Sequence, residues 1–159
     1  MSQAFVRERE GGEVFEDLPD RPISPHTNFV TPEGLAQIEA EVARLQAEAA
    51  SLNPEAKADT ARVSRDLRYW TNRLGTAQRV DPIEGEAVYF GSNVTIERED
   101  GSRQTFRIVG EDEAEPSAGS ISYVSPMAQA LTGRSRGDTV EVNGHEIEIV
   151  AVEASRPAA

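Results

Sequence analysis

Two stretches of the chain carry apolar residues at the spacing of amphipathic helices. The first follows Thr31-Pro32-Glu33, a hydroxyl cap with proline and an acid behind it, and the second follows Asn53-Pro54-Glu55. The apolar residues lie three or four apart, at Leu35, Ile38, Val42 and Leu45 in the first stretch and at Val63, Leu67, Trp70, Leu74 and Ala77 in the second. Two such helices joined by a short turn predict an antiparallel coiled-coil hairpin over residues 31–80.

The pattern changes to strict alternation after the hairpin. Pro82 ends the second helix, and residues 87–152 alternate apolar and polar positions, as strands with one buried face do. Glu99–Ser102 and Asn143-Gly144 are hairpin turn signals, and Ser125-Pro126 starts a short helix. We therefore predict an α+β fold, in which the helical hairpin precedes a small domain, residues 81–153, with a mostly antiparallel sheet and one short helix.

The chain ends show neither periodicity. In residues 1–30, Pro19, Pro22 and Pro25 recur at every third position, which favours an extended backbone. This leader is either a flexible tail or an arm along another surface, and its apolar anchors would be Phe5, Val14, Phe15 and Leu18. Residues 154–159 are predicted to be a short tail.

Composition excludes several classes of function. Across 159 residues, 28 acidic side chains face 16 basic ones, for a formal net charge of −12. Broad contact with a phosphate backbone needs clustered Lys and Arg, so we expect protein partners and no sequence-specific nucleic-acid binding. The sequence contains no signal peptide and no stretch that could span a membrane. We expect a cytoplasmic protein with no membrane partner.

Catalytic chemistry is hard to assemble from these residues. Without cysteine and with only two histidines, His26 and His145, the usual zinc sets cannot form. Phosphate-binding loops, dinucleotide fingerprints and nucleophile elbows are also missing. We expect no cofactor, no metal site and no enzymatic activity. Carboxylates at a projecting hairpin tip could serve another enzyme's metal, and Glu55 and Asp59 are the candidates, although helix capping and solvated charge account for both without a catalytic role.

A resemblance to the C-terminal domain of the GreA/GreB transcript-cleavage factors is carried by FGSNVTIEREDGSRQTFRIVGEDEAEPSAGSISYVSPMAQALTGRSRGDTVEV. The helix start TPEGL extends the resemblance more loosely into the hairpin. The resemblance implies an FKBP-like domain that binds bacterial RNA polymerase at the rim of its secondary channel, with the hairpin entering that channel. The implied polymerase-binding residues are Glu111, Asp112, Glu113, Ser125, Pro126 and Met127.

The hairpin tip departs from the family pattern. The family's cleavage function lies in a tip motif of the form D-L-S-E-N-A-E-Y, whose acids help to hold a catalytic Mg²⁺ in the polymerase. This chain has SLNPEAKADTARV there, and both predicted arms are shorter. The resemblance thus implies a factor that modulates elongation or initiation without cleavage, with some likeness to Rnk-type regulators.

Two alternatives remain open. One is a cleavage factor that uses Glu55 and Asp59 as substitute tip acids. The other is an FKBP-like isomerase or protein-interaction module without a polymerase partner. DNA binding remains only a term attached to the family. A monomer is expected, because the hairpin covers its own apolar stripe.

Overall fold

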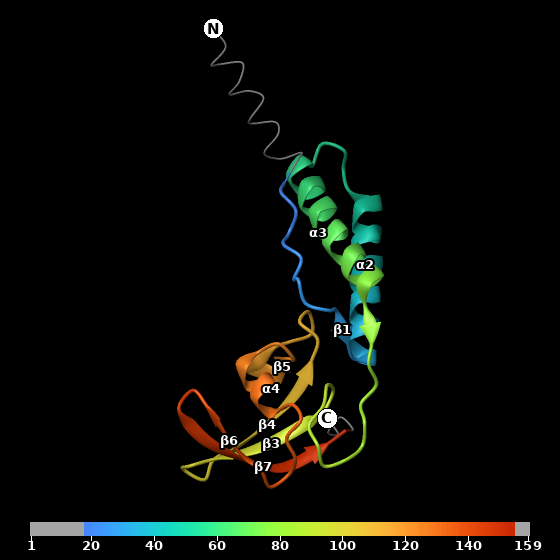
Figure 1. Cartoon of the computed structure of the whole chain (residues 1–159). Coiled ribbons are helices and arrows are strands. Elements are labelled where there is room, and N and C mark those ends of the chain that lie inside the picture. The colour runs from blue at the N-terminus through green and yellow to red at the C-terminus, as the bar shows by residue number, and fades with distance from the viewer. Residues whose placement is uncertain (1–17, 155–159) are drawn as a thin grey trace. The chain divides into compact units, whose positions relative to one another are not determined.

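The computed structural model describes residues 18–154, which form two compact units (Figure 1). The helical unit contains residues 36–76 and the described leader up to His26. The C-terminal unit contains residues 27–35 and residues 77–154. The predicted leader anchors Phe5, Val14 and Phe15 and residues 155–159 of the predicted tail lie outside the described residues.

The helical hairpin consists of α2 (Pro32–Ser51) and α3 (Lys57–Thr76). Thr31 caps α2 as predicted, since its Oγ1 accepts the Gly34 N–H at 3.0 Å. The second helix begins later than its signal indicated. The Asn53 side chain accepts the Glu55 N–H at 2.9 Å and so closes the turn, and α3 starts only after it. Each helix has 20 residues, hence a length of about 30 Å.

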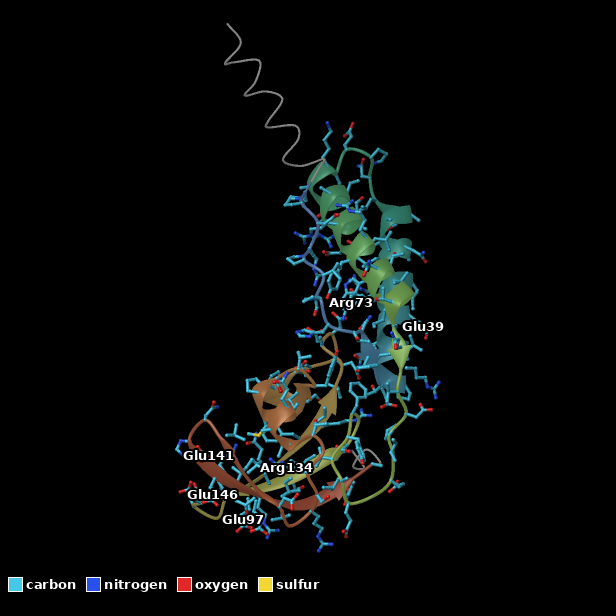
Figure 2. All side chains as sticks on the ribbon, in the orientation of Figure 1. Glu39, Arg73, Glu97, Arg134, Glu141 and Glu146 are labelled. Atoms are coloured by element: carbon cyan, nitrogen blue, oxygen red, sulfur yellow. The ribbon has the colours of Figure 1, made fainter. Side chains whose placement is uncertain are left out.

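The apolar stripe of α3 is displaced from the predicted one. Val63 is buried, but Leu67, Trp70 and Leu74 are only half-buried. Arg73, which is labelled in Figure 2, is 2% exposed. Trp70 is half-buried because it also faces the leader, whose Arg21 lies 5.8 Å from the Trp70 ring centroid.

The C-terminal unit is a curved five-stranded sheet with one short helix (Figure 1). The strand order is β5-β4-β3-β7-β6, and all pairs are antiparallel except β4 with β5. The elements are β3 (Asn93–Arg98), β4 (Arg103–Val109), the short 3₁₀-helix η1 (Pro116–Ala118), β5 (Ser120–Ser122), α4 (Pro126–Leu131), β6 (Thr139–Val142) and β7 (His145–Glu153). A separate parallel pair joins β1 (Phe29–Val30) to β2 (Gln78–Arg79). The predicted fold class is confirmed.

Local turn chemistry sets the register of this sheet. Asn143 and Gly144 have φ of 54° and 80°, the left-handed pair that a two-residue hairpin turn requires. Between β3 and β4, Asp100 accepts hydrogen bonds from the Ser102 hydroxyl and N–H, which lower the pKa of its carboxyl group. Gly91 and Ser92 form a tight bend before β3, in which the Ser92 N–H donates to the Tyr89 carbonyl at 3.0 Å. The register of β3 with β7 shifts at a bulge between Thr95 and Ile96.

The core of the C-terminal unit lies between the sheet and α4. Inward residues of the strands alternate with exposed polar ones, as the sequence pattern predicts. The fully buried side chains include Val88, Val94, Ile96, Ile108, Leu131 and Ile149. Among the described helices, none is long and apolar enough to cross a membrane.

The turn at Asn143 provides a test of the sheet register. Replacing Asn143 with alanine should destabilise the protein by about 1 kcal/mol, because a Cβ-bearing residue other than Asn or Asp is strained at positive φ. The measurement is urea denaturation followed by far-UV circular dichroism. Asn143→Gly is the matched control and should stay within about 0.5 kcal/mol of the wild type. Equal losses in both variants would contradict the assigned turn.

Candidate functional site

The acidic loop and the Ser-Pro turn leave the sheet side by side. β4 and β5 run parallel, with Val109 opposite Ser122, and the Tyr123 N–H donates to the Val109 carbonyl at 2.9 Å. Parallel neighbours end at the same edge of a sheet. The residues that follow them, from Gly110 and from Tyr123, therefore start from one edge of the C-terminal unit, and the acidic loop then runs back to the start of β5, where Glu115 pairs with Ser120.

The Ser-Pro turn starts α4. The Ser125 Oγ accepts the Ala128 N–H at 3.3 Å, and Pro126 occupies the first helical turn, where no N–H is needed. Pro126 is exposed, while Met127 is half-buried against the core. This turn presents Pro126 to solvent on a backbone that is fixed from both sides.

The three acids of the loop have different environments. Glu111 and Asp112 are half-buried. The Glu113 carboxylate accepts the backbone N–H groups of Thr31 and Gly110, at 3.0 Å and 3.1 Å, and the Thr31 hydroxyl as well. Three donors saturate most of its lone pairs, so Glu113 holds the start of α2 to the acidic loop.

Two glycines make this close approach possible. A Cβ on Gly34 would overlap the Glu113 carboxylate, and a Cβ on Gly110 would overlap the Phe29 carbonyl oxygen. Gly34 is unfavourable inside a helix for reasons of backbone entropy. The closeness of Glu113 explains why a glycine occupies that position.

A second charged side chain holds the same turn of α2. Arg107 of β4 lies 2.5 Å from the Glu33 carboxylate, and its side chain is 10% exposed. Within the described part of the chain, the buried Arg107 Nε has no hydrogen-bond partner. The first turn of α2 is thus bound to the C-terminal unit by a carboxylate, Glu113, and by a guanidinium, Arg107.

An aromatic cluster fixes the segment before α2. Phe29 packs against Phe90 at 6.0 Å and against Tyr123 at 5.4 Å between ring centroids. The Tyr123 hydroxyl donates to the Thr27 carbonyl. The Phe29–Phe90 pair is tilted and the Phe29–Tyr123 pair is edge-to-face. Such aromatic pairs add to the energy of apolar burial, so residues 27–31 are an integral part of the C-terminal unit.

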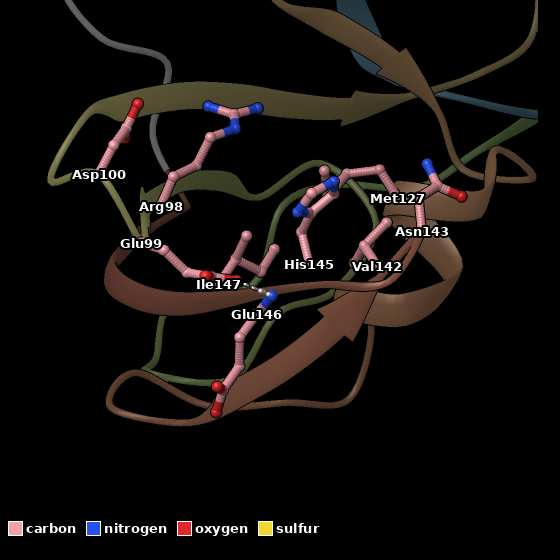
Figure 3. Close-up of a pocket in the computed structure, with 9 residues that line it drawn as sticks. All are labelled: Arg98, Glu99, Asp100, Met127, Val142, Asn143, His145, Glu146 and Ile147. Atoms are coloured by element: carbon pink, nitrogen blue, oxygen red, sulfur yellow. Dashed lines mark hydrogen bonds between the residues drawn. The ribbon is translucent and has the colours of Figure 1, made fainter.

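The C-terminal unit also has an open hollow of about 430 Å³ (Figure 3). Its lining residues come from the β3–β4 turn, the β6–β7 turn and α4; they are Arg98, Glu99, Asp100, Met127, Val142, Asn143, His145, Glu146 and Ile147. None of these nine is Phe, Tyr or Trp. His145, at the start of β7, is exposed.

The outer face of the sheet is acidic. Glu141 and Glu146 face each other across β6 and β7, and Glu97 faces Glu148 across β3 and β7. Figure 2 shows Glu97, Glu141 and Glu146 gathered at one end of the sheet. Arg103 of β4 pairs with Glu97 at 2.9 Å, and the carboxylates of Glu141, Glu146 and Glu148 oppose contact with a phosphate backbone.

The hairpin tip holds the two candidate catalytic acids. Glu55 is exposed in the turn, and Asp59 is exposed in the first turn of α3, 3.9 Å from Arg62. Arg62 also binds Glu48 of α2 at 2.5 Å, and this hydrogen bond raises the pKa of Arg62. The Arg62–Glu48 ion pair near the tip therefore joins α3 to α2. Within residues 18–154, no group of three or more histidine and acidic side chains could hold a metal ion.

The sequence singled out both Thr31 and Glu113, but nothing in it indicated that these two residues contact each other. Thr31 and Glu113 stand in the TPEGL and GEDE segments, 82 residues apart. Arg107 had no signal beyond its place on a polar strand face. A hydroxyl at a helix start could have been paired with a loop carboxylate only by knowing which loop approaches it.

The Glu113 contact predicts a large local effect of one substitution. Replacing Glu113 with alanine leaves two backbone donors and a hydroxyl without their acceptor, and should cost about 2 kcal/mol. Amide hydrogen exchange at Thr31 and Gly110 should accelerate by at least about tenfold. Glu115→Ala, an exposed acid of the same loop, is the control and should leave both rates within about twofold. Similar rates in both variants would show that Glu113 does not hold α2.

Comparisons with known proteins identify relatives of this chain. Residues 83–154 match the family model "Transcription elongation factor, GreA/GreB, C-term". The chain is 42% identical over 98 residues to transcription elongation factor GreB of Neisseria meningitidis serogroup B, which covers 57% of this chain and 60% of that protein. The crystal structure of GreA factor homolog 1 of Thermus thermophilus superposes with a TM-score of 0.40, at 25% identity, over 80% of this chain and 99% of that one.

A second relative extends the match beyond the C-terminal unit. Transcription elongation factor GreA of Desulfovibrio desulfuricans is 35% identical over 134 residues, which covers 71% of this chain and 83% of that protein. More than two thirds of both sequences therefore align. The chain belongs to the GreA/GreB family of transcription elongation factors.

Proposed function

We propose that this chain binds bacterial RNA polymerase at the secondary channel and modulates elongation or initiation without stimulating transcript cleavage. The observation that carries the proposal is an asymmetry within the chain. The family match covers residues 83–154 with the acidic loop and the Ser-Pro turn, while the tip acids of the family motif are replaced. The function follows from the family and from which of its parts this chain keeps.

The C-terminal edge formed by residues 110–116 and 123–127 is our proposed polymerase-binding surface. Its proposed contacts are Glu111, Asp112, Glu113, Ser125, Pro126 and Met127. Exposed Pro126 is the most accessible of these. Since Glu113 is bonded to Thr31 and Gly110, its part in binding is to position the loop for its neighbours.

The positions of the acids at the hairpin tip support the proposal that this chain does not stimulate transcript cleavage. Glu55 and Asp59 lie on opposite sides of the start of α3, and Asp59 is near a cation, Arg62. Arms of about 30 Å set an upper limit to the reach of these acids. Catalysis by a tip carboxylate depends on correct placement in the active site, which binding energy elsewhere cannot replace.

The remaining features fit a polymerase accessory protein. A net charge of −12 favours contact with a basic protein surface over contact with nucleic acid. We infer a cytoplasmic monomer that is not itself an enzyme. A cleavage factor that uses substitute tip acids is the main alternative, and a protein-interaction module for another partner and an FKBP-like isomerase are two others. The hollow of the C-terminal unit lacks aromatic lining, which counts against the isomerase.

Binding to purified bacterial RNA polymerase tests the proposed surface. Glu111→Arg should lower the affinity by at least about tenfold, because reversing a charge at a complementary interface introduces repulsion. Glu141→Arg, on the outer face of the sheet, should change it by less than about twofold. Both variants should keep the wild-type far-UV spectrum. A failure of the wild type to bind, or equal losses in the two variants, would exclude this surface.

Backtracked elongation complexes test the absence of cleavage. Adding the wild-type protein should release no 3′ RNA fragment above the intrinsic rate of the polymerase. A bacterial GreB protein serves as the positive control. Fragment release by the wild type that disappears in Glu55→Ala/Asp59→Ala would instead establish a cleavage factor with substitute tip acids.

A peptidyl-prolyl isomerase assay tests the alternative that the C-terminal unit is an FKBP-like isomerase. The wild-type protein should leave the cis–trans relaxation of a short proline peptide at its uncatalysed rate, tens to hundreds of seconds at 25 °C. A concentration-dependent acceleration would contradict the proposal that the C-terminal unit acts as a docking domain.

A further inference from the structure

The described leader lies along α3 within the helical unit (Figure 1). Arg68 of α3 binds the leader twice: its Nε donates to Asp20 Oδ1 at 2.5 Å, and its Nη2 donates to the Leu18 carbonyl at 3.3 Å. Arg21 of the leader lies 3.6 Å from Asp66 Oδ1 of α3. Two ion pairs of opposite polarity, Arg21 with Asp66 and Asp20 with Arg68, thus join the leader to α3.

Two aromatic rings of α3, Tyr69 and Trp70, also contact the leader. The Arg21 guanidinium carbon lies 3.9 Å from the centre of the Tyr69 ring and 5.8 Å from that of Trp70. The two rings meet edge to face at 5.1 Å. A cation over aromatic faces is attracted by their quadrupoles, and arginine also stacks its planar group on them. Arg21 is therefore held by an acid and two rings at once.

The charges on α3 fit the order of the charges in the leader. Asp66 of α3 pairs with Arg21, and Arg68 pairs with Asp20. The helix therefore complements a segment in which an acidic residue precedes a basic one. A segment with the two charges exchanged would bring like charges together. Like-charge juxtaposition is a device by which proteins reject wrong partners. Asp66 and Arg68 of α3 can thus distinguish a peptide with the sequence Asp-Arg from one with the sequence Arg-Asp.

The leader sequence is suited to such a site. Pro19 and Pro22 flank the Asp-Arg pair, and each proline fixes its own φ and keeps the residue before it extended. Residues 18–24 contain no helix or strand. A segment that is already extended loses little conformational freedom when it binds. The Asp20–Arg68 pair is solvent-exposed and therefore weak, and Asp66 keeps a second partner in Arg65 at 3.1 Å when Arg21 leaves, so the bound segment can exchange.

We propose that α3 carries a recognition site for an extended Asp-Arg-Pro peptide, which the leader fills in cis and which a partner protein with such a segment fills in trans. The site consists of Asp66, Arg68, Tyr69 and Trp70. It is independent of the proposed polymerase-binding surface, which belongs to the C-terminal unit. Opening the leader uncovers an aromatic pair and a charged pair on the hairpin.

Trp70 is the only tryptophan of the chain and therefore reports on this site. The test uses the full-length Asp20→Ala/Arg21→Ala variant, whose leader lacks both charged contacts, and a synthetic peptide of residues 18–26. Titrating the peptide should change Trp70 emission in a saturable way. The wild type should respond at least about tenfold more weakly, because its tethered leader competes at a roughly millimolar effective concentration.

Two controls make the result specific. A peptide with Asp and Arg exchanged keeps the composition and the prolines and should give no saturable change. Adding Asp66→Asn to the double variant should weaken the native peptide at least about threefold, while far-UV circular dichroism shows unchanged helix content. No response of the double variant to the native peptide, an equal response to the exchanged peptide, or an equal response of the wild type would overturn the proposal.

Discussion

The bonds to the Glu113 carboxylate are the interaction on which the C-terminal unit depends most. They connect the acidic loop to the first turn of α2 through Thr31, and the loop to its own start through Gly110. The Thr31 hydroxyl that donates to Glu113 also accepts the Gly34 N–H, so helix cap and loop anchor are one network. A carboxylate at a helix N-terminus also interacts favourably with the helix dipole.

This network gives the family-like segments a shared physical role. The glycines at positions 34 and 110 leave room for the carboxylate and for the Phe29 carbonyl. Arg107 and the Phe29–Phe90–Tyr123 cluster hold the same short stretch from other sides. The loop that we propose as a polymerase contact is therefore anchored at one of its acids, which leaves Glu111 and Asp112 on a fixed backbone. Preorganised loops lose less entropy when they bind.

Local signals in the sequence predicted most of the elements. Thr31, Ser125 and Asn143-Gly144 act through bonds to residues nearby in the chain, so a single sequence shows them. The predicted start of α3 was wrong, because the Asn53 side chain can cap either a turn or a helix. The roles of Glu113, Arg107 and Arg21 could not be predicted, since their partners lie 82, 74 and 45 residues away. Only tertiary packing selects such partners.

We propose that the edge with the acidic loop and the Ser-Pro turn docks on RNA polymerase. Site-specific photo-crosslinking tests it most directly, with a photoreactive residue placed at Pro126 in one variant and at Glu148, on the outer face of the sheet, in another. We predict a crosslink to a large polymerase subunit from position 126 and none from position 148. A crosslink from position 148 alone, or from neither position under conditions where the protein binds, would contradict the account.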